Sequence, residues 1–295
     1  MYHELRNDFI KIQIEELGAE LASIMNNHTQ KEYLWNADPK YWKRCSPVLF
    51  PFVGSLNKKS YLFQGKIYPA SQHGFARDMQ FHLDKKSDCE IWFSLEENET
   101  TMKIYPFPFR LEIGYLLNEN VITVLWRVIN KGENNLYFSI GAHPAFLCPL
   151  DPEETQNDCF LSFDTNSPLS YSHINENGLL VRKPNGAQNY ISTDFGVLPI
   201  DPHMFDYDAL IIENHQCHQI SLLDSTRMPY VTVTFDAPLL GLWSPAGKNA
   251  PFICIEPWYG RCDREDFTGT LQEREWGNSL LPGKVFKASY TIEIK

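Results

Sequence analysis

An alternation of apolar and polar residues recurs along this chain and constrains its fold more than any other feature. The alternation runs through residues 9–14, 121–129, 230–235 and 287–294. A period of two places successive side chains on opposite faces of a strand, so each segment predicts a strand with one buried and one polar face. No segment shows an apolar stripe with helical spacing over three turns. The pattern therefore predicts an all-β protein.

Turn-forming residues separate these segments. Asn, Gly and Pro gather at 118–120, 131–135, 175–178 and 184–186. Short strands without an alternating strand–helix rhythm are typical of a sandwich or a barrel. No linker or low-complexity tract divides the 295 residues. We expect one domain over residues 1–295, built of two large packed antiparallel sheets, with a short helix near 39–44 or 201–206.

The charge balance narrows the classes of partner. Lys and Arg number 26 against 37 Asp and Glu, which gives a formal net charge of −11. Nucleic acids and anionic membranes bind basic surfaces, so we expect neither as a partner. The first residues lack a basic head followed by an apolar run, and the apolar stretches are too short to span a bilayer. We expect a cytoplasmic protein.

Seven cysteines with no Cys-x-x-Cys pair predict reduced and mostly buried thiols. The one tight His/Cys cluster consists of His215, Cys217 and His218. A zinc site needs three or four ligands in a suitable geometry, and no partner pair is spaced to complete one here. We interpret this cluster as a solvated loop and expect no metal.

Glu256 is the first candidate for chemistry. It follows the apolar run 252–255 and precedes Pro257, which we expect to end the strand and open a pocket there. A carboxyl group among apolar neighbours has a raised pKa, and a raised pKa suits a general base. The alternative is a Glu on the polar face of an edge strand.

Two histidines at turn positions could supply an acid near neutral pH. His143 lies in a Gly-Ala-His-Pro turn, and His73 precedes Gly74, a residue that permits left-handed backbone. Each histidine alone is more often structural than catalytic. Together with Glu256 at a strand end, they would form an acid–base set.

Aromatic and basic residues complete the candidate site. Trp258 follows Glu256 and Trp243 lies on the preceding segment, where their faces could stack on a sugar or fill the core. Arg44 and Arg77 could hold hydroxyls or a phosphate through their guanidinium groups. A surface ion pair is the alternative for Arg77, because Asp78 is next to it.

Seven short motifs follow one another along nearly the whole chain. They are Tyr-Leu-Trp-Asn at 33–36, Tyr-Trp-Lys-Arg-Cys-Ser-Pro-Val-Leu-Phe-Pro-Phe-Val-Gly at 41–54, Gln-His-Gly-Phe-Ala-Arg-Asp at 72–78, Tyr-Pro-Phe at 105–107, Ser-Ile-Gly-Ala-His-Pro-Ala-Phe at 139–146, Asp-Ala-Leu at 208–210 and Cys-Ile-Glu-Pro-Trp-Tyr-Gly at 254–260. Their order and spread, rather than any one of them, carry the resemblance. In this combination the sequence resembles the aldose 1-epimerase (galactose mutarotase) family, and most closely its LacX-like branch.

The resemblance implies a galactose mutarotase-like β-sandwich, or supersandwich, with an open sugar-binding cleft. It also implies interconversion of the α and β anomers of a free aldose, without a cofactor or a metal. In that reaction Glu256 would be the base on the C1 hydroxyl, and His143 would be the acid at the ring oxygen. The expected partner is a small sugar, and the expected state is a monomer or a homodimer.

The resemblance assigns further residues to sugar binding. His73 would hydrogen-bond the sugar beside His143, and Arg77 would hold a hydroxyl near the acid. Asp208 fits the Asp-Ala-Leu motif, so we prefer it to Asp206 as a ligand for hydroxyls. Arg44 would lie further round the rim, and Trp258 and Trp243 would offer their aromatic faces.

The chain also departs from part of the family. Galactose mutarotases usually follow the acid histidine with Tyr or Ser and then Phe-Asn, whereas residues 144–146 here are Pro-Ala-Phe. The histidine before Gly-Phe-Ala-Arg is shared with the LacX-like and hexose-phosphate branches. Two alternatives to a free-hexose mutarotase therefore stay open: a hexose 6-phosphate mutarotase, and a non-catalytic sugar-binding or sensor protein of the same fold.

Overall fold

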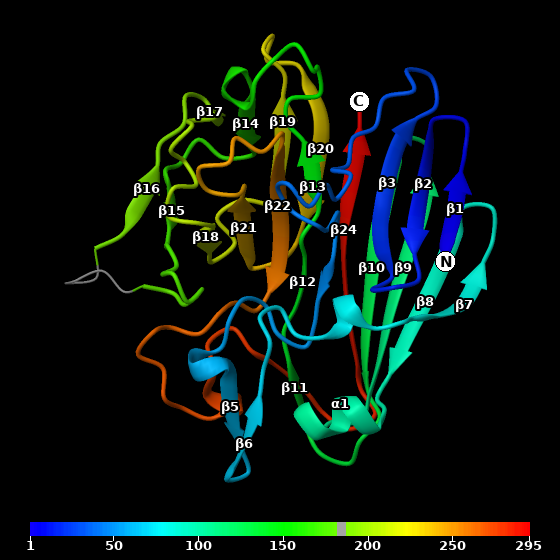
Figure 1. Ribbon diagram of the computed structural model, residues 1–295, viewed down its shortest axis with the longest axis vertical. Helices are drawn as coiled ribbons and strands as arrows, with labels where there is room; N and C mark the ends of the chain where they lie inside the picture. Colours follow the sequence, from blue (N-terminus) through cyan, green and yellow to red (C-terminus); the bar gives the residue numbers. More distant parts are fainter. Residues whose placement is uncertain (182–186) are drawn as a thin grey trace.

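Strands make up nearly all of the regular structure in the computed structural model, which describes residues 1–181 and 187–295 (Figure 1). The prediction of an all-β protein is confirmed. All pairs between named strands are antiparallel. The turn expected at 184–186 lies outside the described residues. Within the described residues, no helix has the length and apolar character needed to cross a membrane.

The largest sheet has nine strands. In spatial order they are β17 (Val197–Pro199), β14 (Phe160–Phe163), β19 (Gln219–Leu223), β20 (Pro229–Phe235), β24 (Val285–Ile294), β10 (Val121–Asn130), β9 (Phe109–Asn118), β8 (Glu90–Glu96) and β7 (His82–Lys86). Three of the alternating segments in the sequence lie in β10, β20 and β24, as predicted. In β10 and in the second half of β24, buried residues alternate with less buried ones because successive side chains of a strand point to opposite faces.

The second sheet positions the candidate site. Its strands are β18 (Leu210–Glu213), β21 (Leu239–Trp243), β22 (Phe252–Tyr259), β12 (Ile140–Ala142) and β4 (Val48–Leu49), with β13 (Ala145–Leu147) also paired to β22. The preceding strand along the chain, β11 (Leu136–Phe138), belongs to a different sheet from β12.

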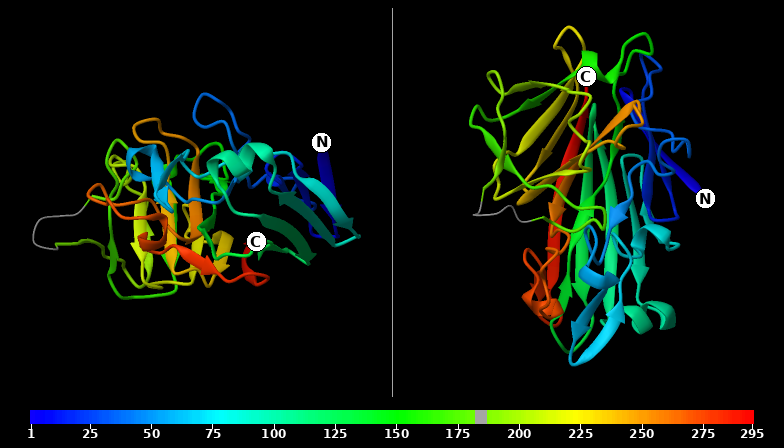
Figure 2. Two further views of the ribbon diagram at one scale, coloured as in Figure 1. Left: turned by 90° about the horizontal axis from the view of Figure 1, so that it is seen from below. Right: turned by 60° about the vertical axis from the view of Figure 1, so that its left-hand side comes forward.

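A smaller sheet carries the fourth alternating segment. It consists of β1 (Tyr2–Arg6), β2 (Ile10–Glu15) and β3 (Glu20–Asn26), and it lies against β8–β10 (Figures 1 and 2). The apolar face of β2 shares one core cluster with the apolar faces of β9 and β10. The hydroxyl of Tyr115 on β9 donates to the Ala19 carbonyl at 2.7 Å, which joins the two layers.

Three two-stranded sheets and some short helices complete the described chain. The pairs are β5 (Ser60–Phe63) with β6 (Lys66–Pro69), β11 with β23 (Asn278–Leu280), and β15 (Leu169–Tyr171) with β16 (Asn189–Ile191). The short helices are α1 (Glu99–Ile104) and the 3-10 turns η1 (Asn57–Lys59), η2 (Ala76–Asp78), η3 (Gln156–Asp158) and η5 (Leu271–Glu273).

The predicted helix positions are wrong. Residues 39–44 and 201–206 form turns and irregular backbone, whereas α1 lies in a segment where no helix was expected. The reason for α1 is local: Asn98 caps it by accepting hydrogen bonds from the N–H groups of Thr100 and Thr101, and Thr101 bonds back. A helix of this length is too short to show an apolar stripe, which is the signal on which the sequence-based expectation depended.

Candidate active site

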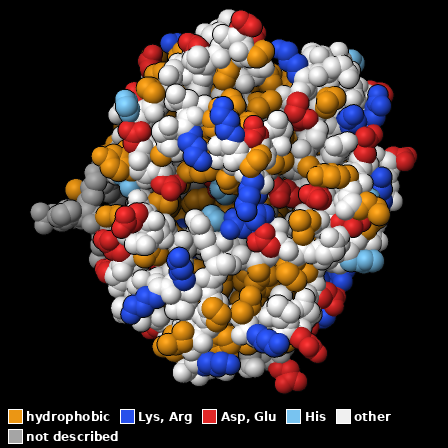
Figure 3. All heavy atoms as spheres, viewed as in Figure 1, with side chains coloured by type: hydrophobic (Ala, Val, Ile, Leu, Met, Phe, Trp, Pro, Cys, Tyr) orange, Lys and Arg blue, Asp and Glu red, His pale blue; other side chains and the backbone are white. Residues whose placement is uncertain are grey.

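A cavity of about 500 Å³ opens on the six-stranded sheet. It brings together all eight residues predicted from the sequence, namely Arg44, His73, Arg77, His143, Asp208, Trp243, Glu256 and Trp258. These residues come from six separate segments of the chain. Figure 3 shows a hollow in which histidine, acidic and apolar side chains lie beside a group of basic ones.

Glu256 reaches this cavity because of the alternation in β22. Ile253 and Ile255 belong to the main core, so Cys254 and Glu256, which alternate with them, lie on the opposite face. Only 1% of the surface of Glu256 is exposed. Glu256 therefore lies on a strand and lines the cavity.

The expectation that Pro257 ends this strand is wrong. β22 continues to Tyr259, and Glu256 pairs with Gly241 of β21 in its interior. On its other side β22 pairs first with β13 and then with β12, and His143 lies in the break between those two strands. A residue without an N–H group is tolerated where the neighbouring ladder is interrupted.

The same break brings His143 to Glu256. The Nε2 atom of His143 lies 3.4 Å from Oε2 of Glu256, and both side chains are buried. Two tryptophans surround the imidazole ring: Trp42 stacks on it with a centroid separation of 4.7 Å, and Trp243 meets it edge-on at 5.4 Å. The ring is therefore held in one orientation toward the carboxyl group.

Burial shifts the two pKa values of this pair in opposite directions. Desolvation, reinforced by the nearby Asp208 carboxyl, raises the pKa of Glu256 well above 4.5, while a hydrogen bond from Trp258 lowers it in part. Desolvation, reinforced by the Arg77 guanidinium, lowers the pKa of His143 to about 3. Both shifts favour the uncharged forms, which are a protonated carboxyl group and a neutral imidazole.

His73 presents a hydrogen-bond donor to the cavity. Its Nδ1 accepts the Gly54 N–H at 3.2 Å, so the proton of the neutral ring is on Nε2. Burial, then the His143 ring and nearby arginines, lowers the pKa of His73 well below 6.5 and keeps the ring neutral. Backbone φ values of 63° at His73 and 71° at Gly74 form the turn. A Cβ on Gly74 would lie 2.2 Å from the Phe50 carbonyl oxygen, so only glycine fits there.

The two arginines are partly engaged by the protein. Arg44 forms an ion pair with Asp78 at 2.5 Å, and Arg77 donates to the Gln72 carbonyl at 2.8 Å. Among the residues that the structure describes, the buried Nε group of Arg77 has no hydrogen-bond partner. Burial and the charge of Arg44 lower the pKa of Arg77 to about 10, so it stays charged at neutral pH. Each guanidinium keeps free N–H groups for a ligand.

Asp208 and Asp206 differ in position, and the preferred residue, Asp208, is the one that lies in the cavity. Asp208 lines the cavity, whereas Asp206 forms an ion pair with His203 on the exposed turn and is absent from the lining. Asp208 has a left-handed φ of 67° and accepts the Ala209 N–H at 2.8 Å. Burial raises the pKa of its carboxyl group, while hydrogen bonds from Ala209 and Trp243 lower it in part.

The tryptophans form a wall of the cavity. Trp258 is buried and packs so closely on Gly241 that a Cβ there would lie 2.5 Å from its ring. Trp243 is half-buried and contacts Trp42 edge-on at 5.5 Å. Sequence reasoning missed Trp42 as a site residue, although it lies in the motif at 41–54 and two residues before Arg44.

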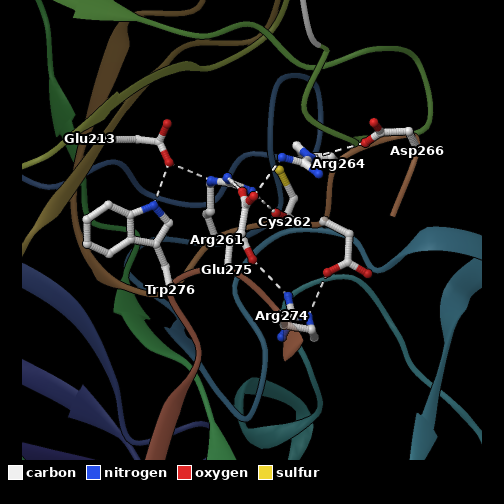
Figure 4. Close-up of polar contacts among 9 residues, drawn as sticks. Glu213, Arg261, Cys262, Arg264, Asp266, Arg274, Glu275 and Trp276 are labelled. Atoms are coloured by element: carbon white, nitrogen blue, oxygen red, sulfur yellow. Dashed lines mark hydrogen bonds and ion pairs between the residues drawn. The ribbon is translucent and has the colours of Figure 1, made fainter. Parts of the chain in front are cut away.

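A network of buried charges holds the segment that follows β22 (Figure 4). Arg261 donates to Glu213 at 2.6 Å, and the indole N–H of Trp276 donates to the same oxygen at 2.7 Å. Arg274 pairs with Asp263 at 2.6 Å, and both side chains are buried. Removing one partner would leave an uncompensated buried charge, so this network fixes the end of β22 firmly.

Most of the cysteines are buried, as expected, and the two histidines of the His/Cys cluster are exposed. Six of the seven cysteines are buried free thiols, and Cys89 is exposed. His215, His218 and Asp236 are exposed, and one ligand atom from each lies within 4.8 Å of the other two. Cys217 is buried and is not part of that group.

Comparisons with known proteins all give aldose 1-epimerases or proteins related to them in sequence or structure. The family model for aldose 1-epimerase matches residues 1–275. The chain is 32% identical to protein LacX (chromosomal) of Lactococcus lactis subsp. lactis over 99% of this chain and 98% of that protein. A galactose mutarotase related enzyme from Lactobacillus acidophilus has a similar structure, with a TM-score of 0.93, 33% identity and coverage of 100% of this chain and 97% of that one. A galactose mutarotase-like protein from Lactobacillus casei ATCC 334 gives a TM-score of 0.92 and 31% identity, with both chains fully covered.

Proposed function

Because the chain belongs to the aldose 1-epimerase family, we propose that it interconverts the α and β anomers of a free aldohexose. In this proposal Glu256 is the general base and His143 the general acid. The observation that carries it is the buried pair itself, with His143 Nε2 3.4 Å from Glu256 Oε2 in a cavity of about 500 Å³. A binding site alone has no need for such a pair.

The reaction moves two protons and breaks one bond. The Glu256 carboxylate takes the proton of the C1 hydroxyl, the bond between C1 and the ring oxygen breaks, and the His143 imidazolium protonates the ring oxygen. The product is the open-chain aldehyde. After rotation about C1–C2, the reverse transfers close the ring on the other face, so nothing is consumed.

Proton sharing within the pair fits this cycle. Ring opening starts from carboxylate and imidazolium, and it ends with a protonated Glu256 and a neutral His143. The directions of the two pKa shifts favour the second form in the empty cavity. A bound sugar offers a hydroxyl donor to Glu256 and a ring-oxygen acceptor to His143, and both contacts stabilise the ion-pair form. The two forms carry the same net charge, so a bound sugar can shift the equilibrium from the neutral form to the ion-pair form.

The remaining lining residues would hold the sugar hydroxyls. His73 Nε2 and the free guanidinium N–H groups of Arg77 are donors, and the Asp208 carboxylate is an acceptor. Trp42 and Trp243 would pack against C–H faces of the ring. We favour a neutral hexose over a hexose phosphate, because Asp78 already neutralises Arg44 at 2.5 Å.

A mutarotation assay tests the proposal. Freshly dissolved α-glucose, α-galactose and α-glucose 6-phosphate are followed by polarimetry with wild type and with Glu256→Gln. We expect wild type to accelerate anomer exchange of a free hexose, and Glu256→Gln to lose roughly 10²- to 10⁴-fold in kcat while still binding sugar. Acceleration of the phosphate alone would assign the chain to the hexose-phosphate branch. If wild type and variant both bind sugar and neither accelerates anomer exchange, the chain is instead a non-catalytic binding protein.

A further inference from the structure

Cys254 lies next to the acid–base pair without a role in the proposed reaction. It is on the same face of β22 as Glu256, two residues earlier, and it is fully buried. One ligand atom each from His143, Cys254 and Glu256 lies within 4.8 Å of the other two. Imidazole nitrogen, thiolate sulfur and carboxylate oxygen form a donor set suited to zinc, at ligand distances near 2.0 to 2.3 Å.

A buried polar atom without a partner is an independent sign that this position accommodates a ligand. Oε2 of Glu256 is buried and has no hydrogen-bond partner within the described residues. The Glu256 side chain is more than nine-tenths buried. An unpaired buried acceptor is costly, so this carboxyl oxygen would gain from a ligand that accepts its electron pair.

We propose that His143, Cys254 and Glu256 bind a thiophilic divalent cation such as Zn²⁺, and that this cation inhibits the protein. Inhibition rests on the function proposed above, whereas binding of the ion does not. The bound ion would occupy the lone pairs of the base and of the acid, so neither group could exchange a proton with the sugar. The site is regulatory and contributes nothing to turnover.

The binding step balances through released protons. A thiol and a carboxyl group bind a metal ion only after they lose their protons, so Cys254 releases its proton to the solvent when the ion binds, and Glu256 does so where it is protonated. Metal affinity therefore increases with pH, and Mg²⁺, which prefers oxygen ligands and octahedral geometry, is excluded.

The exposed cluster of His215, His218 and Asp236 is a second place where a metal ion could attach. All three residues are open to water and none lines the cavity. An ion bound there would leave mutarotation unchanged. The variant His218→Ala removes this cluster and separates the two sites.

The first readout is binding of Co²⁺, used as a spectroscopic substitute for Zn²⁺. A thiolate–cobalt charge-transfer band in the near ultraviolet is expected for wild type and for His218→Ala, and it is expected to disappear in Cys254→Ala. Cys159→Ala, which removes a buried thiol outside the cavity, is the matched control and keeps the band. Absence of the band in folded wild type would overturn the proposal even if Cys254→Ala failed to fold.

The second readout is mutarotation with Zn²⁺ or Mg²⁺, corrected for the protein-free rate. We expect Zn²⁺ to lower the catalysed rate by about tenfold or more, Mg²⁺ to have no effect, and a chelator to restore activity. Cys254→Ala should be active and insensitive to Zn²⁺. Zn²⁺ inhibition that persists in Cys254→Ala would overturn the assignment. A wild type with the cobalt band but no mutarotation would contradict the proposed function and leave the metal site established.

Discussion

The Nε2 atom of His143 lies 3.4 Å from Oε2 of Glu256, across the break between β12 and β13. The two residues are 113 positions apart in the sequence, and only the pairing of both short strands with β22 brings them together. The structure records no hydrogen bond between the two side chains, and both are largely buried at the cavity wall. A hydroxyl and a ring oxygen of one sugar can therefore replace the direct contact.

The first prediction concerns the pH dependence of kcat/KM. The active pair holds one proton, so activity is lost when a second proton binds His143 near pH 3, and again when Glu256 loses its proton above its raised pKa. We expect no inflection near pH 6.5, the ordinary value for histidine. Initial mutarotation rates at low sugar concentration, corrected for buffer catalysis, measure the profile. An acid limb centred near 6.5 would contradict it.

The second prediction concerns stability. Above pH 4.5 the Glu256 carboxyl ionises in the unfolded chain but keeps its proton in the folded one, because burial raises its folded pKa. The folded state then binds more protons, and stability falls as pH increases, by about 1.4 kcal/mol per pH unit until the folded pKa is reached. Glu256→Gln should remove this loss.

Urea denaturation at two pH values checks this expectation. Glu256→Gln should be stabilised relative to wild type by more at about pH 7 than at about pH 5. The exposed Glu133→Gln variant is the matched control for an ordinary Glu-to-Gln exchange. A stability difference for Glu256→Gln that is the same at both pH values would show that the carboxyl group ionises normally in the folded state.

The third prediction concerns Trp42. Its ring stacks on His143 at 4.7 Å and lines the cavity, and it lies on an irregular loop rather than in a sheet. Trp42→Ala should lower kcat/KM by about tenfold through loss of one or more kcal/mol of aromatic contact, with little change in Tm. Trp42→Phe should recover part of the activity. Tyr41→Ala is the control, because Tyr41 contacts Trp35 and does not line the cavity; equal losses in both variants would mean that the loop as a whole is responsible.

The fourth prediction concerns the ion pair between Arg44 and Asp78. Asp78 is 60% exposed and neutralises Arg44 at the rim, so Asp78→Asn should release a positive charge without unfolding the protein. We expect glucose 6-phosphate to bind a few-fold more tightly to the variant at low salt, with the KM for the neutral hexose almost unchanged. Isothermal titration at low and high salt measures this. Unchanged phosphate affinity would show that Arg44 does not face the ligand.

Part of this protein follows from local sequence. Alternation predicted β2, β10, β20 and β24 because a strand has a period of two wherever it lies. The same period puts Cys254 and Glu256 on one face of β22, opposite Ile253 and Ile255. The motifs around Glu256, His143 and His73 indicated the family, because each depends on residue types and their order alone.

Other features depended on contacts between distant segments. Pro257 does not end β22, because the neighbouring ladder is already broken at His143. Trp42 became a site residue only when its loop packed over that histidine. The pKa shifts of Glu256 and His143 come from burial, which no local pattern measures. The sequence by itself determined the strands and the chemical groups, whereas the tertiary structure decided which groups meet and how far water is excluded from them, because both depend on packing between residues far apart in the chain.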